Sequence, residues 1–439
     1  MNLNELLCRD VPCACGRTHR ANVEAVYIES GAIARLPGEL QKRGYARPLL
    51  VCDENTLRAA GQRAQAVLSQ ASLSYRTFVY PQTDLAADDR AQAQLFEQVL
   101  DADVLVAVGT GTLGDLCKFV SFRRGLPCFT VATAPSMDGF ASTVAAMITG
   151  DMKVTYETHA PQVILADVDV LQGAPMEMIA AGVGDILGKY TCLCDWQIAH
   201  VVTGEAYCDR IAGMIRDCIR RVVAGLPSLP GRGAEAVRDL CEALVLSGIA
   251  MAYAGNSRPA SGSEHHLSHF FELRFLQQGR PPVLHGIKVG VGTVCVLRAY
   301  ERLKAAQPDF ERALGLAAAF DADAWAARMR AAYGAGAQDV LDLEERAHKN
   351  SPAQVRARLI ALQNNWPAVQ ALIAALPSPT QVRAQLAAVG APTEPAQRGI
   401  DGDLLEEGVV CAKELRVRYG LGQMLFDLGM LGETAQALR

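Results

Sequence analysis

Short apolar, β-branched runs alternate with helix-forming segments through the first 172 residues, and this alternation constrains the fold more than any other feature. We expect strands at 23–28, 48–52, 75–79, 104–108, 128–131 and 163–166. Ala- and Gln-rich segments with helical periodicity, such as 57–70 and 88–100, lie between these runs. Alternation of this kind predicts a mostly parallel sheet with helices on its faces.

The β-type runs stop near residue 172. Long Ala-, Leu- and Arg-rich stretches follow, broken by loops such as 226–233. Residues 377–400 are rich in Ala, Pro and Gln and predict a loop-containing excursion between helices. With 439 residues and 50% hydrophobic content, the chain can bury more than one core. We therefore expect an α/β domain at 1–172 and an all-helical domain at 173–439.

Charge and hydropathy argue against several classes of protein. The net charge of −5 gives no electrostatic reason to expect binding to nucleic acid or to an anionic membrane. No apolar run reaches the roughly 18 residues that cross a bilayer, so we expect no membrane insertion. The N-terminus is too acidic, and its apolar stretch too short, for a secretion signal. The thirteen cysteines, an odd number, then predict reduced thiols and a cytoplasmic protein.

Four of the eight histidines fall within residues 265–285, at His265, His266, His269 and His285. His265 and His269 are four residues apart, so on a helix they share one face. Imidazoles that converge in this way suit a divalent metal, and Asp185 is the best candidate for a completing carboxylate. Such a set leaves a coordination position open, as catalysis requires. Ordinary buried or surface histidines are the alternative.

A glycine-rich turn follows the expected strand 104–108. Gly109, Gly111 and Gly114 would let the backbone approach a phosphate at the start of a helix, although an ordinary strand-to-helix turn explains the same residues. Asp53, at the end of an earlier strand, could accept from a ribose hydroxyl or simply be a turn residue.

The segment 130–142 ends a strand in a loop that is dense in hydroxyl groups and contains Asp138 and Gly139. Such a loop could meet a cofactor on one side and a polyol or phosphate on the other. A capped helix start, with Ser136 or Asp138 as the N-cap, would explain only part of this pattern.

Cysteine pairs occur twice. Cys8, Cys13, Cys15 and His19 lie within twelve residues and could form a small zinc site, but no C-x-x-C spacing is present and a plain loop is the alternative. Cys192 and Cys194 lie in an apolar helical stretch, so we expect their side chains to pack in the protein interior.

These motifs, taken in order, resemble the glycerol-1-phosphate dehydrogenase family, within the wider group of glycerol dehydrogenases, iron-type alcohol dehydrogenases and dehydroquinate synthases. The resemblance runs from about residue 20 to the C-terminus. Its motifs are 51–56 (VCDENT), Gly109-Thr-Gly111 through Asp115 and Lys118, 134–139 (APSMDG) with Ser142, Lys153, 159–167 (HAPQVILAD), 182–185 (GVGD), 261–265 (SGSEH), Ser268-His269 and His285-Gly286. It implies an N-terminal α/β nucleotide-binding domain with a mostly parallel sheet, an all-helical C-terminal domain, and an active site in the cleft between them.

The resemblance also implies roles for individual residues. The metal ligands would be Asp185, His265 and His285, and the metal would be zinc or nickel, with iron as the lesser alternative. Residues near NAD or NADP would be Asp53, Gly109, Gly111, Asp115, Lys118, Thr133, Ser136 and Ser142. Asp138, Lys153 and His269 would lie nearer the substrate and serve in catalysis. Separately from the resemblance, the position of Glu264 beside His265 means that it could orient an imidazole or contact the cofactor.

The activity implied is reversible reduction of dihydroxyacetone phosphate to sn-glycerol 1-phosphate, with the metal as a Lewis acid on the carbonyl. Lys153 and Arg258 are candidate phosphate donors, and we expect a homo-oligomer. A glycerol or other alcohol dehydrogenase, a dehydroquinate-synthase-like lyase and a non-catalytic nucleotide-binding protein remain alternatives.

Overall fold

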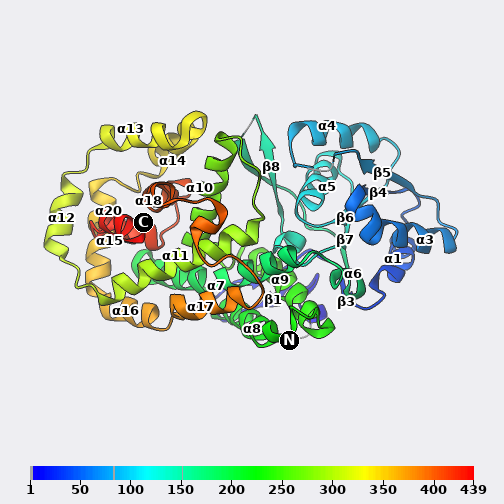
Figure 1. Cartoon of the computed structure of the whole chain (residues 1–439), viewed down its shortest axis with the longest axis horizontal. Helices are drawn as coiled ribbons and strands as arrows, with labels where there is room; N and C mark the ends of the chain where they lie inside the picture. The colour runs from blue at the N-terminus through cyan, green and yellow to red at the C-terminus, as the bar shows by residue number, and fades with distance from the viewer. Residues whose placement is uncertain (1–2, 83–84, 151) are drawn as a thin grey trace. The chain divides into compact units, whose positions relative to one another are not determined.

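The computed structural model describes residues 3–82, 85–150 and 152–439, which form two compact units (Figure 1). The first unit contains residues 1–186, 213–257 and 388–390, and the second contains 187–212, 258–387 and 391–439. None of the described helices is long and apolar enough to cross a membrane.

A six-stranded parallel sheet forms the centre of the first unit. Its order is β3 (Ala25–Glu29), β10 (Val163–Asp167), β7 (Cys128–Ala132), β6 (Val104–Gly109), β4 (Pro48–Asp53) and β5 (Arg76–Tyr80). The six predicted strands are confirmed, with ends that differ by no more than two residues. Strands β6, β7 and β10 are buried along their whole length, which is why they are continuous apolar runs in the sequence.

Helices cover both faces of this sheet, because successive side chains of a strand point to opposite sides. Leu50 and Val106 pack in one hydrophobic cluster with α1 (Leu36–Lys42) and α3 (Gln62–Gln70). Their neighbours in the chain, such as Val51, pack in a second cluster with α4 (Asp89–Gln98) and α5 (Gly111–Arg124).

Two antiparallel hairpins were not predicted from the sequence. One joins β8 (Val144–Thr149) to β9 (Met152–Glu157), and the other joins the two-residue strands β1 (Val11–Pro12) and β2 (Thr18–His19). The apolar run of β8 shows no alternation of polar and apolar residues, and its buried positions Ala145 and Met147 join the cluster around α5. The short strands β1 and β2 carry too few residues for any periodicity to be visible.

Every regular element of the described chain after Asp167 is helical, which confirms the predicted change of character. The helices α6 (Val168–Leu171), α7 (Met176–Thr203), α8 (Asp209–Gly225) and α9 (Ala234–Ala254) come first. They are followed by α10 (Ser263–Gln277), α11 (His285–Ala305), α12 (Phe310–Ala318), α13 (Ala322–Tyr333), α14 (Ala337–Ala347), α15 (Pro352–Asn364), α16 (Trp366–Ala374), α17 (Pro379–Ala387), α18 (Gly402–Cys411), α19 (Leu421–Asp427) and α20 (Leu431–Leu438). Residues 377–400 contain α17 and a loop, as expected.

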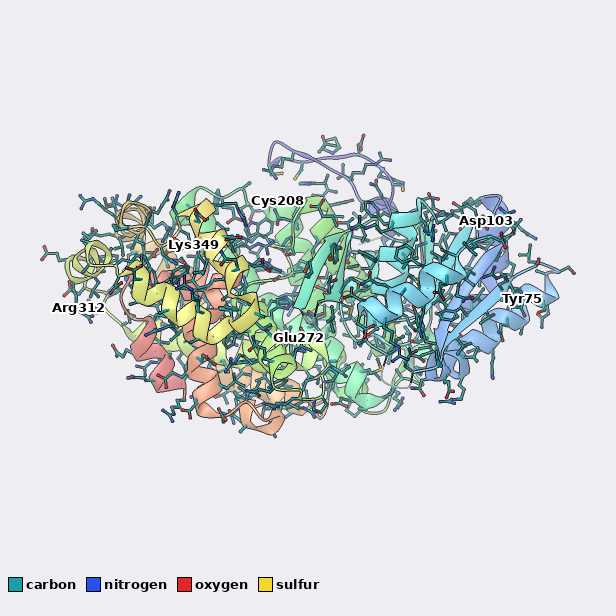
Figure 2. The ribbon with its side chains drawn as sticks, turned by 90° about the horizontal axis from the view of Figure 1, so that it is seen from above. Tyr75, Asp103, Cys208, Glu272, Arg312 and Lys349 are labelled. Atoms are coloured by element: carbon teal, nitrogen blue, oxygen red, sulfur yellow. The ribbon has the colours of Figure 1, made fainter. Side chains whose placement is uncertain are left out.

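A buried charge cluster lies within the second unit. The carboxylate of Glu414 accepts hydrogen bonds from the ammonium groups of Lys413 and Lys349, the latter at 2.8 Å, and from Asn350 Nδ2 at 3.2 Å. Lys349 is labelled in Figure 2. Burial alone would raise the pKa of this carboxyl, but the two lysines outweigh it and hold the pKa at about 2. The cluster joins the segment before α15 to the segment after α18.

We expect Glu414→Gln to lower the free energy of unfolding at pH 7 by about 3–5 kcal/mol, because it leaves two buried ammonium groups without their carboxylate. The folded pKa of about 2 lies below the ordinary 4.5, so this stabilisation is complete above pH 4.5 and is lost as the pH falls towards 2. Urea unfolding at pH 7 and pH 3 measures both effects. Glu433→Gln removes an exposed ion pair with Arg302 and is the matched control. An equal loss at both pH values would contradict the assignment.

Candidate functional site

Three of the four clustered histidines come together within the second unit. His265 and His269 lie one turn apart on α10, and His285 is the first residue of α11. The ring centre of His285 is 5.2 Å from that of His265 and 5.8 Å from that of His269, and the His265 and His269 centres are 6.3 Å apart. His266 points elsewhere and lines a small, mostly apolar hollow with Leu267.

Asp185 supplies a carboxylate to this group. It is fully buried on α7, a single continuous helix whose residues from Leu187 onward belong to the second unit. One oxygen of Asp185 and one nitrogen each of His265 and His285 lie within 4.8 Å of one another. Bonds of about 2.1 Å from one ion place its ligand atoms within about 4 Å, so small side-chain rotations would let these three bind a single cation.

Glu264 fixes the orientation of His265. Its Oε1 lies 2.7 Å from His265 Nδ1 and accepts from Gly262 N at 2.7 Å, while Thr191 Oγ1 donates to its Oε2 at 2.5 Å. Burial raises the pKa of this carboxyl, but the hydrogen bonds from His265, Thr191 and Gly262 outweigh it and lower the pKa. A carboxylate only accepts, so Nδ1 carries the proton and Nε2 keeps the lone pair that a metal needs.

Asp138 lies beside Asp185 within the first unit. The backbone N–H of Asp138 donates to Asp185 Oδ2 at 3.0 Å, and Asp138 Oδ2 accepts from Ser247 Oγ at 2.8 Å. Asp138 precedes a short 3₁₀ turn but its side chain makes no cap bond there, so the capping interpretation does not account for it. Gly182 on α7 allows the loop before Asp138 to come close to that helix, because a Cβ at position 182 would lie 2.0 Å from Pro135 O.

The turn between β6 and α5 leaves the start of the helix open. Gly111 has φ +24°, and a Cβ at Gly111 or Gly114 would meet nothing within 4 Å, so the first turn of the helix is open. Thr110 is the N-cap but makes no side-chain cap bond; its Oγ1 lies 3.2 Å from Ser136 Oγ. The amide groups of the first helical turn can therefore face an anion.

Asp53 and Thr133 lie along the same edge of the sheet as Gly109. The register pairs Val51 with Ala107 and Gly109 with Ala132, so strands β4, β6 and β7 end side by side. Asp53 Oδ1 accepts from Thr56 N at 2.7 Å and forms a capping box, which is the turn role that the sequence left open.

Lys118, Asp115 and Ser142 form a buried cluster of their own. Lys118 Nζ donates to Val144 O at 2.6 Å, to Ser142 Oγ at 3.0 Å and to Gly139 O at 3.2 Å, and it lies 3.0 Å from Asp115 Oδ1. These bonds hold the loop around Gly139 against α5. The predicted cofactor-binding role of these three residues stays a prediction.

The two candidate phosphate donors are placed differently. Lys153 lies in β9 opposite Ile148, and its side chain lies outside the described part of the structure. Arg258 is buried and forms a bidentate ion pair with Glu205, with 2.6 Å between Nε and Oε1. Its guanidinium therefore already has a carboxylate partner.

Comparison with known proteins identifies the family. The model of iron-containing alcohol dehydrogenases matches residues 27–175. A Geobacillus stearothermophilus protein named glycerol-1-phosphate dehydrogenase [NAD(P)+] is 35% identical over 434 residues, which cover 97% of this chain and 98% of the relative. The chain belongs to the glycerol-1-phosphate dehydrogenase family. A Geobacillus thermodenitrificans protein of the same name is 34% identical and covers 90% of both chains.

The fold of this glycerol-1-phosphate dehydrogenase family member is also found in solved structures. Glycerol dehydrogenase from Schizosaccharomyces pombe aligns with a TM-score of 0.61 and 16% identity, over 95% of this chain and 90% of the other. At that identity the likeness concerns the fold alone.

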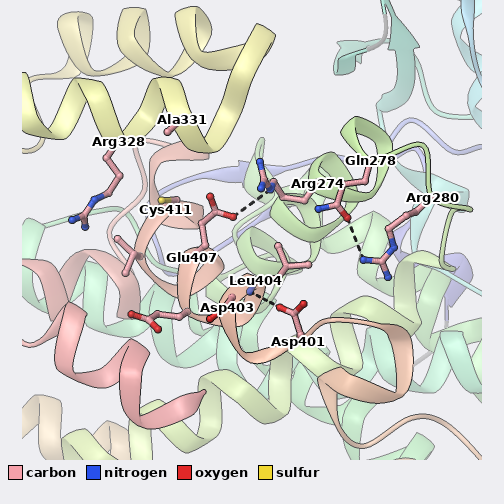
Figure 3. Close-up of a pocket in the computed structure, with 12 residues that line it drawn as sticks. Arg274, Gln278, Arg280, Arg328, Ala331, Asp401, Asp403, Leu404, Glu407 and Cys411 are labelled. Atoms are coloured by element: carbon pink, nitrogen blue, oxygen red, sulfur yellow. Dashed lines mark hydrogen bonds and ion pairs between the residues drawn. The ribbon is translucent and has the colours of Figure 1, made fainter.

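A large open hollow of about 620 Å³ lies elsewhere in the second unit (Figure 3). Its walls carry both charges, including an ion pair of 3.2 Å between Arg274 and Glu407. No candidate site residue lines it, so we assign it no part in the chemistry of this family member.

Three residues of the site environment were missed in the sequence analysis: Thr191, Asp195 and Ser247. Thr191 bonds to Glu264, Asp195 to the start of α10, and Ser247 to Asp138. Asp185, Lys189, Thr191 and Asp195 are polar residues in an otherwise apolar stretch of α7, and these polar groups in an apolar helix were the available signal for Thr191 and Asp195.

We expect Asp185→Asn and His265→Ala each to abolish both bound divalent metal and turnover, because each removes one of three candidate ligands. Glu264→Gln should weaken metal binding by roughly 10–100-fold, because it only loosens the orientation of His265. Metal content after dialysis, measured by mass spectrometry, tests this. The exposed His200, changed to Gln, is the control. Full activity with an empty site would refute the assignment.

Proposed function

We propose that this protein is a metal-dependent, NAD(P)-linked oxidoreductase that interconverts dihydroxyacetone phosphate and sn-glycerol 1-phosphate. The observation that supports it most is the donor group of Asp185, His265 and His285, present in a chain whose relatives are named for that substrate. We further propose a cytoplasmic homo-oligomer.

The candidate metal site has a donor set of two imidazoles and one carboxylate, which suits zinc or nickel and leaves further coordination positions open. When bound, the divalent cation supplies Lewis-acid polarisation of a carbonyl oxygen, and reduced nicotinamide supplies a hydride. Glu264 holds the His265 ring with Nε2 available. The Asp138 amide holds the Asp185 carboxylate.

Other residues of the chain would bind the cofactor and handle the proton. The open first turn of α5, with Gly111, would receive the cofactor diphosphate, and Asp53 would face the ribose. Thr110, Ser136 and Asp138 connect this turn to Asp185 through one loop. His269, whose Nδ1 lies 3.9 Å from Glu272 Oε2, would deliver a proton to the product oxygen. In this scheme residues 1–172 hold NAD(P), and 173–439 hold metal and substrate.

The first experiment is NADH oxidation with dihydroxyacetone phosphate, on metal-stripped protein and after addition of zinc or nickel. We expect turnover only with metal, and none with unphosphorylated dihydroxyacetone. Enantioselective analysis of the product should give sn-glycerol 1-phosphate. Activity with the unphosphorylated ketone alone would instead indicate a glycerol dehydrogenase. Bound metal and cofactor without net NADH oxidation would favour a lyase of the dehydroquinate synthase type or a non-catalytic protein.

The cofactor loop can be tested separately. We expect Gly111→Val to raise the KM for NADH at least tenfold, about 1.4 kcal/mol, because the side chain fills the open first turn and strains a positive φ. The metal content should not change. Gly38→Ala, on α1 with equally open space, is the control. An unchanged KM would exclude this turn as the diphosphate site.

A further inference from the structure

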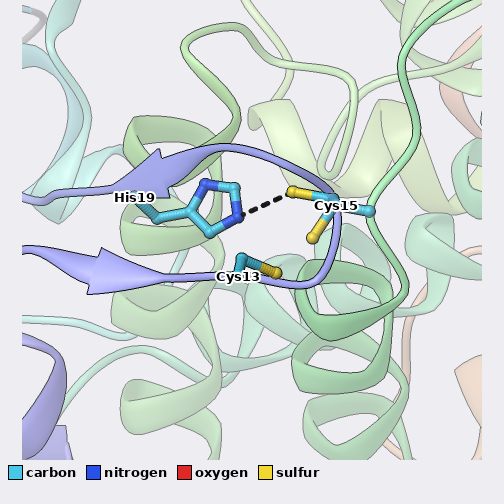
Figure 4. Close-up of side chains that lie close together, drawn as sticks. Cys13, Cys15 and His19 are labelled. Carbon is cyan, nitrogen blue, oxygen red and sulfur yellow. Dashed lines mark hydrogen bonds between the residues drawn. The ribbon is translucent and has the colours of Figure 1, made fainter.

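The hairpin near the N-terminus gathers three metal-binding side chains in one turn. Cys13 and Cys15 lie between β1 and β2, and His19 ends β2 (Figure 4). Cys13 N donates to Arg17 O at 3.1 Å and Gly16 N donates to Cys13 O at 3.1 Å, which closes the turn tightly. Gly16 has φ +82°, a conformation that favours glycine. The turn directs both thiols and the imidazole to one side.

The tautomer of His19 is set for metal binding. Its Nδ1 lies 2.8 Å from the carbonyl oxygen of Tyr253, and its ring stacks on the Tyr253 ring at 5.5 Å and 12°. A carbonyl only accepts, so Nδ1 carries the proton and Nε2 presents a lone pair. That lone pair faces Cys15 Sγ at 3.4 Å.

Cys208 is the fourth member of the group. Cys13, Cys15, His19 and Cys208 each offer one atom, and the four atoms lie within 4.8 Å of one another. Cys208 directly precedes α8 and its carbonyl accepts from Ala212 N at 3.0 Å. Cys208 lies five residues before Gly213, the residue from which α8 belongs to the same unit as the hairpin.

We propose that Cys13, Cys15, His19 and Cys208 bind a structural zinc ion. Zinc bonds of about 2.3 Å to sulfur and about 2.0–2.1 Å to nitrogen hold the two atoms about 3.5 Å apart in a tetrahedron, close to the separation of Cys15 Sγ and His19 Nε2. A thiol–imidazole hydrogen bond would explain that pair but not two further sulfur atoms. Three thiolates and one imidazole fill a tetrahedron, which is typical of a structural site. The proposal does not depend on the proposed catalytic activity.

The ion would stabilise a segment that has little regular secondary structure. Two strands of two residues each are too short to be stable alone, and Cys13 is only partly buried while Cys15 is exposed. Through His19 the site contacts Tyr253, whose hydroxyl donates to Leu6 O at 2.8 Å. One ion would thus attach residues 6–19 to the end of α9 and the start of α8.

Cobalt(II) added to metal-stripped full-length protein under reducing conditions tests the proposal. Thiolate ligation produces a strong sulfur-to-cobalt charge-transfer absorption, whereas the group of Asp185, His265 and His285 has no sulfur and cannot contribute to it. We expect the absorption to saturate at one ion per chain and to disappear when zinc is added. It should be lost in Cys13→Ser and Cys208→Ser and be retained in Asp185→Asn.

Cys8→Ser is the matched control, because Cys8 is an exposed thiol of the same segment outside the group and the variant should keep the absorption. If Cys13→Ser does not fold, His19→Cys gives a second test, since four thiolates should keep the ion and strengthen the absorption. Absence of the absorption in the unmodified protein, or its persistence in Cys208→Ser, would overturn the proposal. A disulfide among these cysteines in protein trapped by alkylation inside reducing cells would also overturn it.

Discussion

The buried carboxylate of Asp195 is the interaction on which the arrangement of the helical unit depends. It lies on α7 and accepts from Ser263 N at 2.7 Å, Ser263 Oγ at 2.6 Å, Leu421 N at 3.0 Å and the Tyr300 hydroxyl. One side chain therefore connects α7 to the first residues of α10 and α19 and to the interior of α11. Removing it would leave several buried donors unsatisfied at once, each at a cost of about 1–3 kcal/mol.

Glycines allow the helices to come as close as these bonds require. A Cβ at Gly262 would lie 2.7 Å from Cys192 Cα, and one at Gly292 would lie 2.7 Å from Glu264 O. These close approaches bring the start of α10 against α7 and α11 against α10. They occur next to the Glu264 carboxylate, which bonds to Thr191 and His265. The direction of the His265 ring thus follows from helix packing that includes the bonds of Asp195, ten residues after Asp185 on α7.

The sheet could be predicted well because buried parallel strands are continuous β-branched runs, and each run is visible without knowledge of its partners. The convergence of His265, His269 and His285 followed from spacing along one helix and from the motif order. The partners of Asp195 and Cys208 could not be predicted, because they lie far away in the sequence. The cysteine segment near the N-terminus was ambiguous for the same reason: three ligands were visible and the fourth was not.

The two proposed metal sites differ in the physical property that matters for function. Three thiolates and an imidazole satisfy a zinc ion completely, so the only free energy available from that site is the free energy of holding chain segments together. Two imidazoles and one carboxylate leave the cation undersaturated, and a substrate oxygen can complete the shell. The three thiolates also favour zinc strongly, whereas the set of two imidazoles and one carboxylate discriminates poorly between zinc and nickel. Exchange of metal would therefore alter catalysis at one site while the fold, held by the other, stays intact.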